Sequence, residues 1–486
     1  MTLPAERRAS VLYAGLLAAV MVALLAAQLR AQEYTQFFID FKVPYCAAQV
    51  MLQGTDPYRF GALTVCEHTV AVPPYVPALR AIDPTLEPPP IPPYEMLPFL
   101  ALARLPFAAA LALWMAANIG GCALAADMLR RALPTLHPAL IGTTVVVSAL
   151  PVGLDLGQFT GIVLFGVTGL GLALRDRKPL TLAASLALVS LQPHVAIPAA
   201  CALLFRPAGR LAVACVAAAI GLVSALLFGG LTLEWLTTVL PGAAAINLID
   251  AGQVSYVSLA ATLGAPLGPT LQASRAIYAG AIALGALAGA RIAARSGRLE
   301  ALPWIAVAIG GLGAPYLHLQ QVTLFLPAAL LLIEIGPSRR WALVAAYGLA
   351  VPWSELVMQS WGPLFALGAA AAAWQRPTPR RLLAVAGTAA LLLAIATGAA
   401  YAFTVLRGPG PLLAPPVAPG EDAWAAFIVQ QGRVYGVATL AARALTWAAG
   451  LLLVMLAATA AFGPGSLTAL AAGGAREATR PFLRPR

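Results

Sequence analysis

The residues best suited to chemistry lie in the stretch DFKVPYCAAQVMLQGTDPY, which begins at Asp40 and follows the first long apolar run. Asp40 is the candidate general base, because a carboxylate within hydrogen-bond reach of a hydroxyl group can remove its proton. The alternative is that Asp40 caps a helix that begins near Val43. Lys42 could pair with Asp40 or bind a phosphate group, and its alternative is an interfacial lysine that extends toward water.

Three further polar groups follow. Asp56 lies in GTDPY, where a glycine and a proline flank it, so Asp56 and Tyr58 are predicted to form a structural turn that holds the loop. Asp155 is a second carboxylate, in the turn GLDLGQ that ends at Gln158. Asp155 and Gln158 are candidates for substrate binding, and capping of the following helix is the alternative for Asp155.

Two histidines lie within apolar runs, where ionisable side chains are costly to bury and are therefore functional candidates. His194 belongs to the tripeptide Gln192-Pro193-His194, and His318 follows shortly after Pro315. Each histidine, and Gln192 beside the first, could donate a hydrogen bond to a phosphate group. The alternative is a hydrogen-bonded histidine of the core.

Other kinds of site have no support in the sequence. It contains no HExxH, CxxC or paired acidic motif, so no metal site is predicted, and it has neither a GxGxxG turn nor a Walker lysine for a nucleotide. No cofactor is predicted. Cys46 and Cys66 share the first loop and could form a disulfide in an oxidising compartment. Two unpaired cysteines are the favoured expectation.

The composition requires that membrane helices position these residues. Hydrophobic residues make up 60% of the chain, charged residues 10%, and the mean hydropathy is +0.83. An ordinary soluble domain carries about 25% charged residues. The apolar runs reach the roughly 20 residues that a spanning helix needs, and backbone amides in lipid must be satisfied within the helix. The fold class is therefore an all-α polytopic membrane protein.

The net charge of +11 is spread over short loops between apolar runs. This is a topology signal and not a nucleic-acid groove, because arginine-rich short loops mark the cytoplasmic side. Residues 31–95 are then the first extracytoplasmic loop, with a juxtamembrane helix. Residues 229–257 and 405–440 are further extracytoplasmic segments, and 463–486 form a cytoplasmic basic tail.

The arginine count also predicts about 12 to 14 transmembrane or re-entrant helices in one integral membrane domain. The first apolar run, from about Val11 to Leu29, is longer than a signal-peptide core and is expected to remain as an anchor. One run, Leu180–Phe205, has both ends on the cytoplasmic side by this count. Two short helices that meet at Gln192-Pro193-His194 would resolve the parity, and a single proline-kinked span is the alternative.

Several segments resemble one family. They are DFKVPYCAAQVMLQGTDPY, PPYEMLPFLALARLPFAAALALWMAAN, LDLGQFTGIVLFGVTGLGLALRDRKP and GAPYLHLQQVTLFLPAALLL. In their order and spacing they are similar to glycosyltransferase family 87, which includes polyprenyl-phosphate-mannose-dependent membrane mannosyltransferases. The resemblance implies a GT-C-type helical bundle with a catalytic carboxylate in the first external loop, and it points to Asp40.

The function that follows from the resemblance is inverting transfer of a hexose, with mannose expected, from a polyprenyl-phosphate donor to a lipid or glycan acceptor. The expected location is the cytoplasmic (inner) membrane of a bacterial cell envelope, with the site facing outward. Membrane lipids, the lipid-linked sugar and the acceptor are the expected partners. The alternative is a transporter or flippase of a lipid-linked glycan. That protein should carry polar residues through several spans to the midplane, whereas here they gather at the helix ends.

Overall fold

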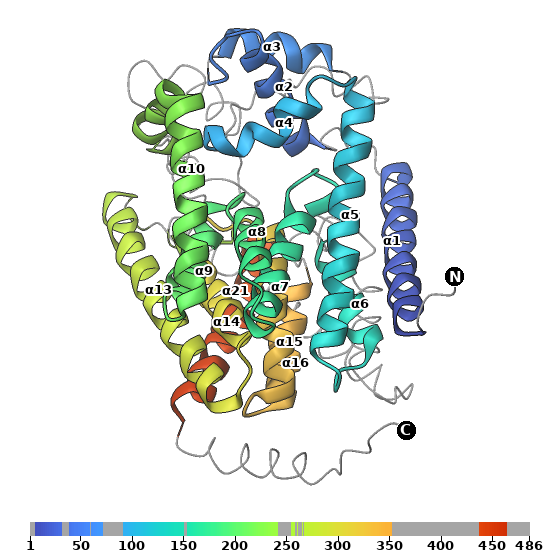
Figure 1. Cartoon of the computed structure of the whole chain (residues 1–486), viewed down its shortest axis with the longest axis vertical. Helices are drawn as coiled ribbons and strands as arrows, with labels where there is room; N and C mark the ends of the chain where they lie inside the picture. The colour runs from blue at the N-terminus through green and yellow to red at the C-terminus, as the bar shows by residue number, and fades with distance from the viewer. Residues whose placement is uncertain are drawn as a thin grey trace.

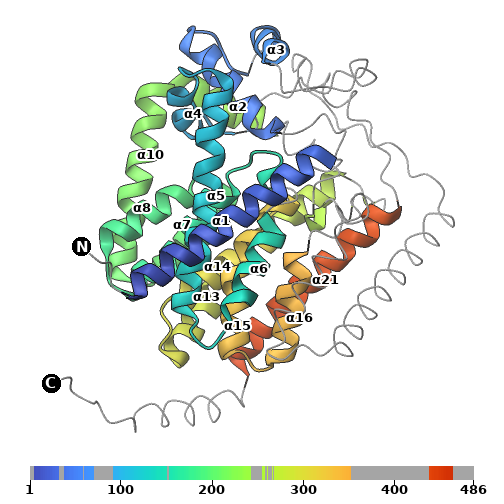
Figure 2. The same cartoon turned by 90° about the vertical axis from the view of Figure 1, so that its right-hand side faces the viewer.

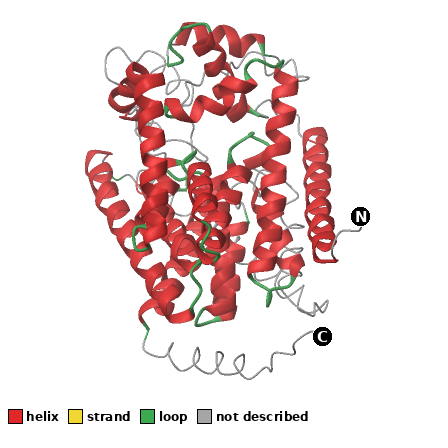
Figure 3. Ribbon diagram, viewed as in Figure 1, coloured by secondary structure: helices red, strands yellow, loops and turns green. Residues whose placement is uncertain are grey.

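The structure is a computed structural model that describes residues 5–31, 38–58, 60–70, 91–149, 153–241, 254–257, 260, 265, 267–351 and 437–463. Helices dominate this part of the chain, and no strand is drawn in it (Figure 3). The predicted class, an all-α polytopic membrane protein, is confirmed.

The helices follow one another along the chain with short connections. The first group comprises α1 (Ala5–Ala31), α2 (Ile39–Leu52), α3 (Phe60–Thr69), the 3-10 helix η2 (Pro93–Met96), α4 (Leu97–Leu102), α5 (Phe107–Ala132) and α6 (Pro138–Ala149). The second comprises α7 (Thr160–Arg175), α8 (Pro179–Val189), α9 (Pro193–Leu203), α10 (Pro207–Glu234) and the π-helix η4 (Trp235–Val239). The third comprises α13 (Leu267–Ser296), α14 (Ala301–Leu312), η5 (Leu319–Phe325), α15 (Leu326–Ile335), α16 (Arg339–Ala350) and α21 (Val437–Phe462).

Among the described residues, five helical stretches are long and apolar enough to cross a membrane. They are Glu6–Ala26, Phe107–Ala132, Pro207–Val239, Pro269–Ser296 and Ala444–Phe462. Shorter apolar helices, α6 to α9 and α14 among them, pack between these. The predicted total of 12 to 14 helices also counts residues 352–436, which lie outside the described part, so that number stays a prediction.

Helices α2, α3 and α4 lie together at one end of the molecule, the top of Figure 1, which we call the α2 end. Helices α5 and α10 run from this end into the bundle, as Figure 2 also shows. Arginines gather at the opposite end. There Arg130 bonds the Ser10 hydroxyl, and Arg298 donates to the carbonyl of Ala132 and pairs with Glu300 at 2.6 Å. We call this the arginine end.

Helices α5 and α7 cross at glycines. A Cβ atom added at Gly161 would lie 1.9 Å from the carbonyl oxygen of Asn118, and one added at Gly121 would lie 2.5 Å from that of Gly161. Small residues let two membrane helices approach until their backbones touch. The close crossing places the start of α7, and the turn before it, against the middle of α5.

Two predicted apolar runs are divided in the structure. The run that we expected from Leu97 to Leu129 is two helices, because Pro106 precedes α5 and ends the shorter α4. The run Leu180–Phe205 is also two helices, α8 and α9, separated by extended backbone at Gln192. A single kinked span is therefore wrong, and the two-helix alternative describes this segment.

The remaining segment boundaries are described only in part. The predicted external segment 229–257 begins just after Phe228, where the helical backbone of α10 is interrupted, but it stays helical to residue 241. Most of the predicted segment 405–440 and nearly all of the tail 463–486 lie outside the described residues.

Candidate active site

The first turn of α2 is docked on the turn that precedes α7. The backbone N–H of Phe38 donates to the carbonyl of Asp155 at 2.8 Å, and that of Asp40 donates to the carbonyl of Leu156 at 3.0 Å. The first amides of a helix have no partner inside it, so carbonyls from a distant turn satisfy them here. Helix α2 can therefore begin at Ile39, four residues before the expected start.

This start excludes the capping alternative for Asp40. The residue before the helix is Phe38, in the left-handed conformation, and no side chain caps it. Asp40 lies inside the first turn, half-buried, and its Oδ2 accepts a hydrogen bond of 2.5 Å from the Gln158 Nε2. The helix dipole favours a negative charge at this place. The structure thus brings together Asp40, Gln158 and Asp155, which are 118 residues or less apart in sequence.

A glycine and a tryptophan hold the turn in position. Gly157 has φ of +75°, and a Cβ atom there would lie 2.8 Å from the Cβ of Phe41. The indole N–H of Trp114 on α5 donates to the Gly157 carbonyl at 2.7 Å. Only glycine adopts this backbone without strain while it allows so close an approach. The Gly-Gln pair therefore presents the Gln158 amide to Asp40.

Aromatic rings pack beneath this first turn. Phe41 contacts four other rings at centroid distances of 5.6 to 5.9 Å, and Phe99 lies 4.7 Å from Trp114. The set comprises Phe41, Tyr45, Phe99, Phe107, Trp114 and Phe159. Tilted and edge-to-face rings at such distances stabilise each other beyond the area they bury. The cluster fixes α2 against α4, α5 and the start of α7.

The capping alternative for Asp155 is also wrong, because another residue caps α7. The Oδ1 of Asn118 on α5 accepts from the backbone N–H of Gly161 at 3.1 Å and lies within 3.4 Å of that of Ile162. Asp155 is buried, and its backbone carbonyl serves α2. Asn118 was not predicted. The signal was a lone asparagine in the apolar run FAAALALWMAANIGGC, since a fully buried amide needs hydrogen-bond partners.

The other polar residues of the first loop are placed as follows. Lys42 is buried on α2. The backbone N–H of Tyr58 donates to the Oδ1 of Asp56 at 2.9 Å, which is the arrangement that a structural turn requires. The hydroxyl of Tyr58 donates to the carbonyl of Ile91 at 2.9 Å, and burial raises the pKa of this phenol. The turn is thus tied to the segment that leads into η2.

The two predicted histidines lie together in a second group. The ring of Tyr316 is 5.3 Å from that of His194 and 4.7 Å from that of His318. Gln321 joins the group, because its Oε1 accepts from the backbone N–H of His318 at 2.9 Å and its side chain is hydrogen-bonded to His194. Gln192 is buried directly before α9, with its Oε1 lacking a hydrogen-bond partner. Tyr316 and Gln321 were not predicted from the sequence.

Hydrogen bonds connect the supports of the two groups. The hydroxyls of Ser148 on α6 and Thr323 on η5 are 2.7 Å apart, which joins the segment before the Asp155 turn to the helix after His318. Tyr94 of η2 donates to the carbonyl of Ser190, just before Gln192, at 2.9 Å. Among the described residues, no three His, Cys, Asp or Glu side chains are placed to hold a metal ion.

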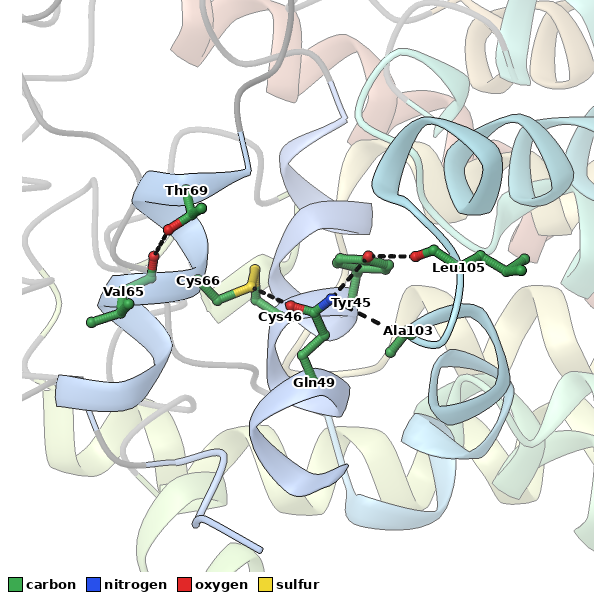
Figure 4. Close-up of a disulfide and its surroundings, with 8 residues drawn as sticks. All are labelled: Tyr45, Cys46, Gln49, Val65, Cys66, Thr69, Ala103 and Leu105. Carbon is green, nitrogen blue, oxygen red and sulfur yellow. Dashed lines mark hydrogen bonds between the residues drawn. A yellow bond between two sulfur atoms is a disulfide. The ribbon is translucent and has the colours of Figure 1, made fainter. Parts of the chain in front are cut away.

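A disulfide joins Cys46 on α2 to Cys66 on α3, with the Cα atoms 5.6 Å apart (Figure 4). The expectation of two unpaired cysteines is therefore wrong. Gln49 lies between this bond and the turn after α4, and donates to the Tyr45 hydroxyl at 3.0 Å. That hydroxyl donates in turn to the carbonyl of Leu105 at 2.7 Å. Helix α2 is tied on both sides.

The fold and site define a class: a polytopic helical membrane protein with a carboxylate held at a helix start, at the end of the molecule away from its arginines. The model of glycosyltransferase family 87 matches residues 92–317, just under half of the 486-residue chain. This match confirms the family predicted from the sequence, and the chain belongs to glycosyltransferase family 87. It is a membrane glycosyltransferase. No curated protein and no solved structure matches it.

Proposed function

We propose that the chain is an inverting glycosyltransferase that moves a hexose, with mannose as the first candidate, from a polyprenyl-phosphate donor to a lipid or glycan acceptor. The observation that carries this proposal is the Asp40 carboxylate, held by Gln158 in the first turn of α2 in a member of glycosyltransferase family 87. The nature of the donor and acceptor goes beyond the family match and rests on the chemistry of the site.

The reaction needs a base on one side of the sugar and a neutralised phosphate on the other. Asp40 takes the proton of the acceptor hydroxyl as the oxygen attacks the anomeric carbon, and the carbon–oxygen bond to the polyprenyl phosphate breaks. Attack opposite the leaving group inverts the anomeric centre. The amide N–H of Gln158 orients one carboxylate oxygen, so that the base is positioned before the acceptor arrives. Asp155 is a candidate for holding a substrate hydroxyl.

The leaving phosphate is assigned to the second group. His194 lies in the first turn of α9, and helix starts favour anions because their amides point outward. His318 lies near it across the Tyr316 ring, and Gln321 contacts both histidines. Gln192 offers a buried amide beside them. Lys42 is a further cation on the Asp40 side that could meet the same phosphate.

Two observations support an outward-facing site in a cytoplasmic membrane. Arginine pairs and bonds gather at the arginine end, which is the cytoplasmic side by the distribution of positive charge. The Cys46–Cys66 disulfide lies at the α2 end, and disulfides persist in oxidising compartments. Both assign the Asp40 group to the extracytoplasmic face.

The proposal is tested with the purified protein in lipid vesicles that contain an acceptor lipid extract. Synthetic polyprenyl-phosphate mannose, polyprenyl-phosphate glucose, polyprenyl-phosphate arabinofuranose and a nucleotide-linked mannose are supplied in turn. We expect transfer from a lipid-phosphate hexose, with an inverted anomeric configuration in the product. Transfer from the nucleotide sugar alone, or a retained configuration, would contradict the proposed donor or mechanism.

A further inference from the structure

A buried carboxyl group lies outside the predicted site, in the 3-10 helix η2. Glu95 is 2% exposed, and its Oε1 has no hydrogen-bond partner. Among the described residues the salt bridges are formed by other acids, namely Asp127, Asp176, Glu300 and Glu334. A buried charge without a cation is very costly, so this carboxyl needs a different explanation.

The hydrogen bonds around Tyr94 fix the location of a proton. The Tyr94 hydroxyl donates to the Ser190 carbonyl at 2.9 Å, and this uses its only proton. The side chain of Glu95 is hydrogen-bonded to the same tyrosine. Since the hydroxyl has no second proton to give, the proton in that bond belongs to Glu95. The chain of bonds therefore runs from a neutral carboxyl to the phenol and on to the carbonyl.

The surroundings favour the same protonation state. Asp56 and Tyr58 from the turn after α2, and Glu234 at the end of α10, face this corner together with Glu95. All of these groups are acidic or phenolic, and none supplies a positive charge. Burial raises the pKa of Glu95 well above its ordinary value.

The chain of bonds reaches a sensitive place in the fold. Ser190 ends α8, where carbonyls lack partners within the helix, and it lies two residues before Gln192 and four before His194. On the other side, η2 leads directly into α4, whose Phe99 packs on Phe41 of α2. The Tyr94 hydroxyl thus connects the elements that carry the two groups of the site.

We propose that Glu95 and Tyr94 are positioning residues that hold the break between α8 and α9 in register with the Asp40 group, and that they do so only while Glu95 carries its proton. The purpose assigned to this connection rests on the proposed function, since it aligns the leaving phosphate with the base. The connection itself follows from the hydrogen bonds and is independent of the reaction.

The pH dependence has a definite sign. A carboxyl whose pKa is raised in the folded state contributes stability that is complete below the ordinary carboxyl pKa of about 4.3 and is lost as the pH rises through the raised value. Ionisation would remove the proton that bonds Tyr94 and leave a buried charge. We therefore expect both the unfolding temperature and the affinity for the donor to fall on the alkaline side.

The test compares Glu95→Gln, Glu95→Ala and Tyr94→Phe with the wild type. A glutamine amide can donate to Tyr94 without carrying a charge, so Glu95→Gln should restore what alanine loses and should abolish the alkaline decline. Glu95→Ala and Tyr94→Phe should raise the KM for the lipid-phosphate donor by about tenfold, the effect of losing one hydrogen bond. Glu6→Gln, an exposed acid of α1, is the matched control.

Thermal unfolding against pH, measured on the same variants in detergent, gives a readout that needs no turnover. We expect the alkaline decline of the wild type to disappear in Glu95→Gln and to persist in Glu6→Gln. A Glu95→Gln variant as impaired as Glu95→Ala, or one with an unchanged alkaline decline, would overturn the inference. Absence of transfer by the wild type with a retained pH effect on unfolding would overturn the proposed function alone.

Discussion

Asp40 and Gln158 form one unit, in which the amide decides how the carboxylate is presented. The bond between Gln158 Nε2 and Asp40 Oδ2 joins two elements 118 residues apart. A hydrogen bond to a charged group is worth about 1.5–3 kcal/mol. We expect Gln158→Leu to lower kcat by about 10- to 100-fold with little change in the acceptor KM, because orientation and not binding is lost. Initial rates in vesicles measure this.

The matched control is Gln53→Leu, which removes an exposed glutamine just after α2. That variant should turn over at the wild-type rate. If Gln158→Leu kept a normal kcat, or if both variants lost activity equally, the amide would have no particular role beside Asp40.

At this scale the sequence predicts residue types better than their roles. Asp40, Gln158 and Asp155 could be named because carboxylates and amides outside apolar runs are conspicuous. Their contacts could not be named, since the carbonyls that receive the first amides of α2 come from a turn far along the chain. For the same reason the cap of α7 was assigned to Asp155 and belongs to Asn118 on another helix.

Among the elements, the turn before α7 carries the most geometric constraint. Gly54 and Gly157 both have φ of +75°, but only at Gly157 would a Cβ atom meet another residue, the Cβ of Phe41 at 2.8 Å. Alanine at either position costs about 1–2 kcal/mol of backbone strain. We expect Gly157→Ala to cost about 1–3 kcal/mol more, because α2 must move, and to reduce transfer. Gly54→Ala should lose stability only. Thermal unfolding and initial rates of the two variants separate strain from displacement.

The disulfide between α2 and α3 is the second constraint on the Asp40 helix. It closes a sequence separation of 20 residues, for which the expected stabilisation is about 3 kcal/mol. The double variant Cys46→Ser/Cys66→Ser should therefore unfold at a lower temperature than the wild type. Dithiothreitol should lower the wild type to the same level, as differential scanning fluorimetry can show.

Cys215→Ser is the control, because this exposed cysteine is free. It should unfold like the wild type, with the same loss on reduction. An unfolding temperature of the double variant equal to that of the wild type would mean that the bond does not stabilise α2.

Elements were predictable where hydropathy or proline marks them. The division of Leu180–Phe205 followed from the proline and the charge count, and the spans followed from apolar length. The start of α2 was placed too late because its first amides are satisfied by the Asp155 turn, a contact that no local pattern shows. The pairing of the cysteines also depends on how α3 packs against α2, which the sequence does not reveal.

On the scale of the whole molecule, the two ends differ in charge. The arginine end contains the buried ion pairs of Asp127 with Arg130 and Arg131, and the α2 end contains the site. We predict that Gln53→Cys is labelled by a membrane-impermeant maleimide in intact cells with the outer layers removed. Asp176→Cys, beyond α7 on the opposite side, should be labelled only after the membrane is permeabilised. The reversed pattern would contradict an outward-facing site.

The whole-molecule arrangement also explains why His194 and His318 could be nominated separately but not as a pair. They are 124 residues apart and meet through the ring of Tyr316, so their proximity depends on the packing of α9 against α13 and α14. Apolar patterning predicts that such helices pack in a bundle. It does not determine which faces meet.

The central claim, that Asp40 is the base in sugar transfer, is tested most directly by Asp40→Asn. The variant keeps the size and one acceptor of the side chain but removes its basicity. We predict that kcat falls by about 10²- to 10⁴-fold while the protein stays folded and binds donor. Asp176→Asn, an exposed acid paired with Arg175, is the control and should transfer normally. Equal turnover by Asp40→Asn and the wild type would contradict the account.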